Sequence, residues 1–214
     1  CQDYIVCQKP VGISSQKSDS KKDMITLISK TLNIPVKNVY PIHRLDMHVG
    51  GTMIYALNKE SASSLSSLIS KNNIKKHYLA IVHGVPQNDN GIMEDLLFKD
   101  SKTNKSYVVK RIRKGVKKAS LEYSVLESTL ADGNPISLVR ILLHTGRTHQ
   151  IRVQFKNQGY PLFGDQLYGD KNNEQIRLFA YKLEFIHPVT KEMMKFKLLP
   201  EWKELENEAI IHRL

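Results

Sequence analysis

The sequence predicts an α+β fold, in which a mixed and mainly antiparallel β-sheet carries a few flanking helices. Three observations predict it: short segments of alternating apolar and polar residues recur along the chain, hairpin-length links join several of them, and only a few segments have helical spacing. The 214 residues are enough for a substantial hydrophobic core. We therefore expect one domain over residues 1–214, and not a doubly wound parallel sheet.

Alternation of apolar and polar residues places the strands. Residues 76–83 put Tyr78, Ala80 and Val82 on one face of a strand. Residues 121–125 alternate in the same way, and the turn Asp132-Gly133-Asn134-Pro135 leads into a more apolar strand over residues 136–143, so these two strands should be antiparallel neighbours. Further strands are predicted over residues 4–12, 52–57, 179–185 and 193–198.

Helical spacing of apolar residues predicts three helices. Ser20 followed by Asp23 resembles a capping box that starts a helix over residues 24–32. A second helix is predicted over residues 61–71. Thr148 is the predicted N-cap of a third helix that runs to Gln158, with Arg152 on the same face as its apolar residues.

The charge balance indicates a polyanionic partner. Lys and Arg outnumber Asp and Glu by 32 to 21, which gives a net charge of +11. Residues 101–118 contain no acidic residue and form either a solvated loop or a strand or hairpin that tracks phosphates. The eight basic residues of this stretch are Lys102, Lys105, Lys110, Arg111, Arg113, Lys114, Lys117 and Lys118.

Two cysteines, Cys1 and Cys7, are too few for a disulfide framework or a four-cysteine zinc site, so a reducing compartment is expected. No apolar run approaches the length of a membrane span, and no leader-like segment opens the chain. We expect a cytoplasmic protein without a membrane partner. Because the chain starts at Cys1 and not at Met, there is room for further residues upstream.

The motif His43-Arg44-Leu45-Asp46 precedes the pair Gly50-Gly51 and a predicted strand. An Asp beside an Arg is usually a surface ion pair. Two glycines nearby let backbone or ligand approach closely, as an active-site loop requires. Both interpretations remain open on these residues alone.

A second stretch, residues 143–152, places two arginines and two histidines around a glycine at the start of a predicted helix. It could bind any anion at the helix N-terminus. A metal site formed by His43, His48, His144 and His149 is another option. No histidine pair has the i, i+4 spacing of a zinc helix, however, so no metal is expected.

These two stretches and Lys76-His77-Tyr78-Leu79-Ala80 resemble, in order and spacing, the three signature motifs of the RluA-type RNA pseudouridine synthases. Further resemblance lies in Lys9-Pro10-Val11-Gly12, in residues 159–169 and in residues 185–190, so that it covers nearly the whole chain. The resemblance implies the pseudouridine synthase fold, with an active-site cleft across the sheet. It also implies isomerisation of specific uridines, in ribosomal or transfer RNA, with base flipping.

By this resemblance, Asp46 matches the catalytic aspartate, Tyr78 the active-site tyrosine and Arg152 the arginine that pairs with the aspartate. Arg44 is similar to the arginine that helps fill the space of the flipped nucleotide, and Leu183 to an apolar residue that lines the uracil pocket. The other predicted substrate-binding residues are His43, Arg147, Thr148, His149, Gln150, Lys110, Arg111 and Arg113.

The chemistry needs no redox cofactor, because only the bond between ribose and base is broken and remade. A carboxylate can attack C1′ or assist loss of the 2′ proton, and Asp46 must be ionised in either case. Members of the family often continue the first motif with Arg-Asp-Thr-Ser-Gly, whereas this chain has residues 47–51 as Met-His-Val-Gly-Gly. Two alternatives are a non-catalytic RNA-binding protein and a metal-dependent phosphoesterase. We expect a monomer.

Overall fold

The computed structural model describes residues 3–19, 22–170, 174–203, 211 and 214. The chain divides into two compact units, each built from separate stretches of sequence. The first unit contains residues 1–76 and 180–199, and the second contains residues 77–179 and 200–214. The expectation of a single domain stays a prediction.

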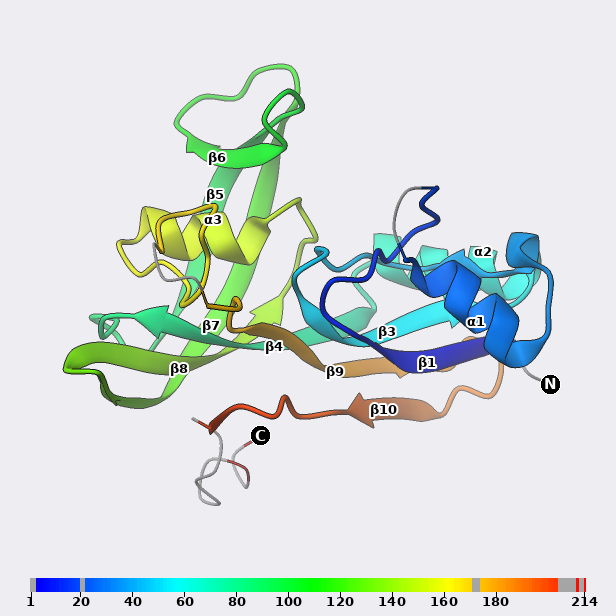
Figure 1. The fold of residues 1–214 in the computed structure, drawn as a ribbon. Coiled ribbons are helices and arrows are strands. Elements are labelled where there is room, and N and C mark those ends of the chain that lie inside the picture. The colour runs from blue at the N-terminus through cyan, green and yellow to red at the C-terminus, as the bar shows by residue number, and fades with distance from the viewer. Residues whose placement is uncertain (1–2, 20–21, 171–173, 204–210, 212–213) are drawn as a thin grey trace. The chain divides into compact units, whose positions relative to one another are not determined.

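The first unit contains three neighbouring strands in the order β1 (Tyr4–Lys9), β3 (Gly50–Ala56) and β9 (Leu178–Ile186). The short strand β2 (Tyr40–Pro41) pairs with β3, and β10 (Met193–Lys197) pairs with β9. The pairs β1–β3, β2–β3 and β9–β10 are antiparallel. Helices α1 (Met24–Leu32) and α2 (Lys59–Ser70) and a 3-10 helix over Val36–Asn38 complete the unit (Figure 1).

The caps of these helices differ in part from the prediction. Asp23, not Ser20, is the N-cap of α1, and its carboxylate accepts a hydrogen bond of 2.7 Å from the Thr26 amide. Ser20 lies outside the described residues. Asn58 caps α2 by accepting from the Ser61 amide at 2.8 Å, so this helix starts two residues earlier than predicted.

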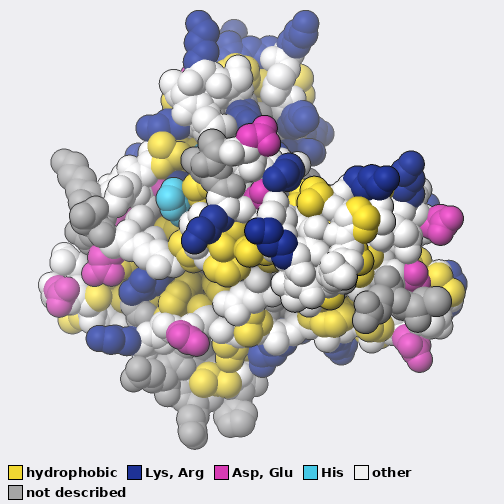
Figure 2. Space-filling view, turned by 45° about the vertical axis from the view of Figure 1, so that its right-hand side comes forward, with side chains coloured by type: hydrophobic (Ala, Val, Ile, Leu, Met, Phe, Trp, Pro, Cys, Tyr) yellow, Lys and Arg dark blue, Asp and Glu magenta, His cyan; other side chains and the backbone are white. Residues whose placement is uncertain are grey.

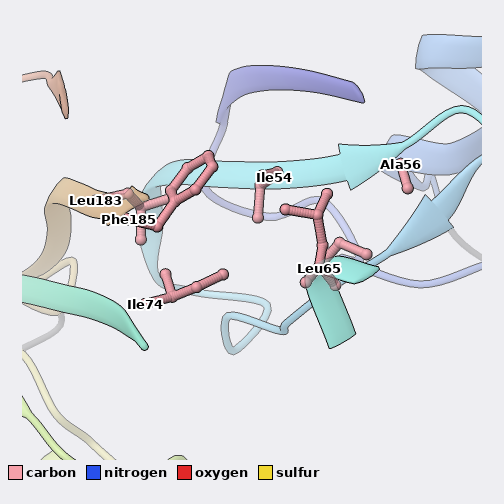
Figure 3. Close-up of a cluster of buried hydrophobic side chains, with 7 residues drawn as sticks. Ile54, Ala56, Leu65, Ile74, Leu183 and Phe185 are labelled. Atoms are coloured by element: carbon pink, nitrogen blue, oxygen red, sulfur yellow. The ribbon is translucent and has the colours of Figure 1, made fainter. Parts of the chain in front are cut away.

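The core of the first unit lies between α2 and the sheet. Leu65 from α2 packs with Ile54 from β3 and with Leu183 and Phe185 from β9, as Figure 3 shows. Leu183 is only 1% exposed. Its side chain is part of this hydrophobic core, and a role for Leu183 in lining a uracil pocket stays a prediction.

Gly51 is required where β3 and β9 meet. Its φ angle is +131°, and a Cβ atom at this position would collide with the backbone of Ala180. The prediction that the glycine pair permits close approach is confirmed at Gly51, where the approaching group is the backbone of a neighbouring strand.

The second unit contains strands in the order β4 (Ile74–His83), β8 (Asn134–Leu143), β7 (Val116–Ala131), β5 (Asn90–Asp100) and β6 (Lys105–Val109). The pairs β5–β6, β5–β7 and β7–β8 are antiparallel. Helix α3 (Gln150–Asn157) packs on the face of β5, β6 and β7 that carries Leu97 and Ala119, where Val153 of the helix meets them.

Two predictions for this unit can be compared directly with the structure. The predicted antiparallel pair around the turn at residues 132–135 is confirmed as β7 and β8. The predicted N-cap at Thr148 is wrong: His149 occupies the N-cap position in a left-handed conformation with a φ angle of 53°, and the helix begins at Gln150 and ends at Asn157. Among the described residues, no helix is long and apolar enough to cross a membrane.

Candidate active site

Asp46 lies in the first unit, on the segment between β2 and β3. Its side chain is half-buried, and its backbone carbonyl accepts a hydrogen bond of 3.0 Å from the Val49 amide, which closes a turn. The carboxylate is thus carried by a short, ordered loop whose C-terminal end runs into the buried strand β3.

A second segment, residues 9–15, fixes the backbone on both sides of Asp46. On one side, the Met47 carbonyl accepts from the Gly12 amide at 2.8 Å and from the Lys9 ammonium at 3.2 Å. On the other side, the Ser15 hydroxyl donates to the Leu45 carbonyl at 2.8 Å and accepts from the Leu45 amide at 3.0 Å. We call these contacts the Asp46 cradle. They explain how the Lys9-Pro10-Val11-Gly12 motif supports a residue far along the chain.

The Ser15→Ala substitution should weaken the Asp46 cradle. It leaves the buried Leu45 amide and carbonyl without their partner, which costs about 1–3 kcal/mol. We expect a matching fall in the free energy of unfolding, measured by urea denaturation, and slower turnover with unchanged RNA affinity. The control is Ser14→Ala, since Ser14 Oγ accepts an exposed bond of 3.3 Å from the Gln16 amide. Equal effects of the two substitutions would contradict the prediction.

Lys9 is a buried cation close to Asp46. Its side chain is fully buried, and burial lowers the pKa of its ammonium group to about 8, while the negative charge of Asp46 opposes this shift. The Lys9 ammonium also donates to the Pro10 carbonyl at 2.9 Å. The cradle therefore places a positive charge within electrostatic range of the catalytic candidate.

The lowered pKa of Lys9 predicts a pH dependence of stability. Between about pH 8 and pH 10.5 the unfolded chain binds more protons at Lys9 than the folded chain, so the free energy of unfolding should rise with pH. The complete rise in the free energy of unfolding is about 3 kcal/mol, and it is absent below pH 8, where Lys9 is protonated in both states. The difference between wild type and Lys9→Met, measured by denaturation at several pH values, should grow in favour of wild type. Parallel pH curves would contradict this.

The other first-motif residues differ in exposure. Arg44 is exposed and donates to the Gln16 side chain at 3.3 Å, so its guanidinium can reach a ligand. His43 Nε2 accepts from the Ile54 amide at 3.4 Å, and its Nδ1 is buried without a hydrogen-bond partner among the described residues. Burial, and secondarily the charge of Lys76, lowers the pKa of His43 to about 3. His43 is therefore a neutral imidazole that supports β3.

Tyr78 and Arg152 lie in the second unit. Tyr78 is on β4 and is 5% exposed. Arg152 is on α3, and its guanidinium makes a two-pronged ion pair with Asp165: Nε and Nη2 each lie 2.7 Å from one carboxylate oxygen. The guanidinium also lies 5.2 Å from the centre of the Tyr168 ring. The arginine thus has a fixed direction, set by a planar fork of hydrogen bonds.

The sequence places Asp165 only within a segment that resembles the family, and its role as the partner of Arg152 was not predicted. Its carboxylate is completely buried and also accepts from the Leu167 amide at 3.2 Å. Gly164 makes this position possible, because a Cβ atom there would collide with the backbone of Gln175. The sequence signal for such a partner is the place of Arg152 on the apolar face of its helix. An arginine on that face becomes buried, and a buried charge needs a partner.

Tyr168 links α3 to β6. Its hydroxyl accepts from the Ser106 amide at 2.8 Å and lies 3.1 Å from His149 Nδ1. The Ser106 hydroxyl in turn donates to the Thr148 carbonyl at 2.6 Å. The predicted substrate-binding residues Thr148 and His149 are therefore part of an internal network that holds strand β6 on the N-terminal end of α3.

Gln150 and Arg147 stabilise the turn before α3. The Gln150 side-chain oxygen accepts from the Thr145 hydroxyl at 2.7 Å and from the Arg147 amide at 3.1 Å, and its side-chain amide donates to Ser120. Arg147 is exposed and donates one bond of 2.9 Å to the Lys118 carbonyl. The Gln150 side chain thus stabilises the turn, whereas the Arg147 side chain is exposed to solvent.

The predicted basic residues Lys110, Arg111 and Arg113 are all exposed on the loop between β6 and β7. Among the described parts of the chain, no group of three or more His, Cys, Asp or Glu side chains could hold a metal ion. His144 Nε2 lies 2.8 Å from Glu122, and His149 is engaged by Tyr168 as described.

Comparison with known proteins identifies the family. A family model described as RNA pseudouridylate synthase matches residues 3–157 of the chain. The chain belongs to the RNA pseudouridylate synthase family. Within it the chain is of the RluA type, so the predicted family is confirmed, and with it the activity class of an RNA pseudouridine synthase, an isomerase.

Similar proteins support the same assignment. An uncharacterised RNA pseudouridine synthase of Haemophilus influenzae is 37% identical over 86% of this chain and 78% of its own length. The tRNA pseudouridine synthase C of Pasteurella multocida is 29% identical over 89% of this chain and 85% of its own length. Human RNA pseudouridylate synthase domain containing 1 has a TM-score of 0.74 and 25% identity, with 94% of this chain and 81% of that one covered. These comparisons confirm the predicted mixed, mainly antiparallel fold.

Proposed function

We propose that this pseudouridine synthase isomerises specific uridines in structured transfer or ribosomal RNA, with Asp46 as the catalytic carboxylate. The observation that carries the proposal is the Asp46 cradle: hydrogen bonds from residues 9–15 to Leu45 and Met47 hold the loop of a motif aspartate from both sides. Such support is what a residue needs if it must meet one carbon atom of a ribose within a few tenths of an ångström.

In this proposal the target nucleotide is flipped out of its stack, which costs a few kcal/mol, and exposed Arg44 fills the space it leaves. The Asp46 carboxylate then attacks C1′ or assists loss of the 2′ proton, and the bond from C1′ to N1 breaks. The uracil rotates, and C5 bonds to C1′ while the ester bond from C1′ to Asp46 breaks in the first route or the 2′ proton returns in the second. The C5 proton leaves last. Neither route uses a redox cofactor.

Tyr78 and Arg152 complete the proposed machinery. The Tyr78 ring provides an apolar surface for the detached base, and its hydroxyl is suited to help remove the C5 proton at the end. Arg152 is proposed to orient the Asp46 carboxylate, and the buried pair with Asp165 supports this role by fixing the direction of the guanidinium. Lys110, Arg111 and Arg113 are proposed to contact phosphates, which gives affinity and register.

The transfer or ribosomal RNA target is proposed from the names of relatives. One is a tRNA pseudouridine synthase C, and another is a ribosomal large subunit pseudouridine synthase C of Pasteurella multocida, 29% identical over 94% of this chain and 64% of its own length. Incubation with cellular RNA from a strain that lacks the enzyme, followed by carbodiimide primer extension, should reveal a new pseudouridine. If none forms in any RNA, the proposed reaction fails and the non-catalytic RNA-binding alternative is favoured. If activity disappears in strong chelator, a metal-dependent reaction replaces the proposal.

A further inference from the structure

The outer part of β5, together with β6 and the loop that leads into β7, forms a projecting region with unusual charge. We call residues 96–118 the basic arm; it contains nine Lys or Arg residues and one acidic residue, Asp100. The Asp100 carboxylate is engaged in the turn, where it accepts from the Lys102 amide at 2.8 Å and the Thr103 hydroxyl at 3.0 Å. Lys and Arg side chains gather at the top of Figure 2, over the end of the unit where Figure 1 shows β6.

The two faces of the basic arm have different partners. Cross-strand neighbours point to the same face of a sheet, and so do residues two apart in a strand. The pair of Ser106 and Lys99 and the pair of Val108 and Leu97 therefore share one face, the inner face. This inner face is occupied, because Ser106 is bonded to Tyr168 and Thr148, and Val108 packs beside Leu97. The arm is thus anchored on α3 by its inner face, and its outer face remains for a partner.

The outer face carries aromatic and planar groups among the cations. Tyr107 pairs across the strands with Phe98 and is 44% exposed. The Arg113 guanidinium lies over the Phe98 ring, 4.9 Å from its centre. Phe98 thereby holds a flat cation in place on the same face as an exposed tyrosine ring.

The positive charge of the outer face ends within a few residues along the sheet. Moving inward on the same face, the pair of Leu96 and Lys118 is followed by Glu94 opposite Ser120, and then by Ile92 opposite Glu122. The face therefore changes from basic to acidic two pairs beyond Phe98. A polyanion would be attracted to the outer part alone.

We propose that the outer face of the basic arm is a stacking subsite for an unpaired base of the RNA substrate, with Tyr107 and the guanidinium of Arg113 as the stacking surfaces. This proposal rests on RNA being the substrate, as proposed above. Unpaired RNA bases stack on aromatic rings and on arginine planes, while nearby cations bind the phosphates. The outer face offers both groups together: a ring and a flat cation for a base, and Lys105 and Lys118 for the backbone.

The test uses two labelled probes and the whole 214-residue chain. One probe is an unpaired oligoadenylate of about 12 nucleotides, and the other is an abasic RNA of the same length and charge. Oligoadenylate contains no uridine, so turnover does not contribute to its binding. We expect Tyr107→Ala to weaken oligoadenylate binding roughly 5- to 150-fold, the loss of one stacked base, without changing the salt dependence or the affinity for the abasic probe. Tyr107→Phe should bind like wild type.

Two further variants separate stacking from charge. Arg113→Lys keeps the charge and loses the plane, so it should weaken oligoadenylate binding and leave the salt slope unchanged. Lys110→Ala should reduce the salt slope by about 0.7 for both probes. Unchanged oligoadenylate binding by Tyr107→Ala, or equal loss on both probes, would overturn the stacking subsite. Pseudouridine formation is assayed separately on uridine-containing RNA: its absence in a protein that binds through Tyr107 overturns only the proposed function.

Discussion

Asp46→Asn should fold and bind RNA like wild type and form no measurable pseudouridine, with turnover reduced by roughly 10²–10⁴-fold or more. The structure gives the reason why folding should survive. The hydrogen bonds of the Asp46 cradle reach the backbone of Leu45 and Met47, so they do not need the carboxylate. Asparagine keeps the size of the side chain and removes its charge. Product formation is measured by carbodiimide mapping, and RNA affinity by fluorescence anisotropy.

The same variant has a second readout that does not depend on activity. The charge of Asp46 raises the pKa of Lys9 against the effect of burial, so its removal should lower the Lys9 pKa below about 8. NMR titration of the Lys9 side chain measures this shift. Asp19→Asn is the matched control, since Asp19 is exposed and the change in net charge is equal. Appreciable turnover by Asp46→Asn would remove the central assignment.

The parts of the fold that repeat a local pattern were predictable. Strand β4 and the β7–β8 hairpin follow from alternation and from turn residues, and both are present. Strand β5 was not predicted, because acidic Glu94 and Asp95 interrupt its apolar residues. Asp95 proves to be paired within the unit, where its carboxylate accepts from Gln154 at 2.8 Å. A strand whose polar residues find partners on a distant helix has no local signature.

The candidate site was predictable only as a set of motif residues. The motifs supplied Asp46, Tyr78 and Arg152, while the support around them depends on contacts between distant segments. Ser15 lies 30 residues before Leu45 in the chain, and the hydrogen bonds between them follow no periodicity. Similarly, the sequence does not reveal that Gln150 is used by its own turn and that Leu183 belongs to the core. Motif membership indicates importance and leaves open whether a side chain contacts substrate or supports its neighbours.

The Arg152–Asp165 pair should give the largest change in stability. Its two side chains are 8% and 0% exposed, so Asp165→Leu or Arg152→Met leaves a buried charge without its partner, at a cost of about 3–5 kcal/mol in the free energy of unfolding. The double substitution removes both charges and should recover most of this loss, because apolar groups of similar volume often replace a buried pair without penalty. Urea denaturation of the four proteins measures the coupling. The control is the pair of half-buried Arg177 and exposed Glu174, where Glu174→Ala should cost at most about 1 kcal/mol because the carboxylate is in water.

The double variant also separates structure from chemistry. If Arg152 orients the Asp46 carboxylate, the stable double variant should bind RNA nearly as well as wild type and turn over as slowly as Arg152→Met. If RNA affinity falls as much as turnover, Arg152 is a phosphate ligand. If turnover recovers together with stability, the pair serves folding alone and the positioning role is wrong. Asp165→Glu keeps the negative charge but lengthens the side chain. It therefore displaces the two carboxylate oxygens that accept from Arg152 Nε and Nη2 at 2.7 Å. Its turnover should fall more steeply than its stability, since catalysis is more sensitive than folding to a small displacement of the guanidinium.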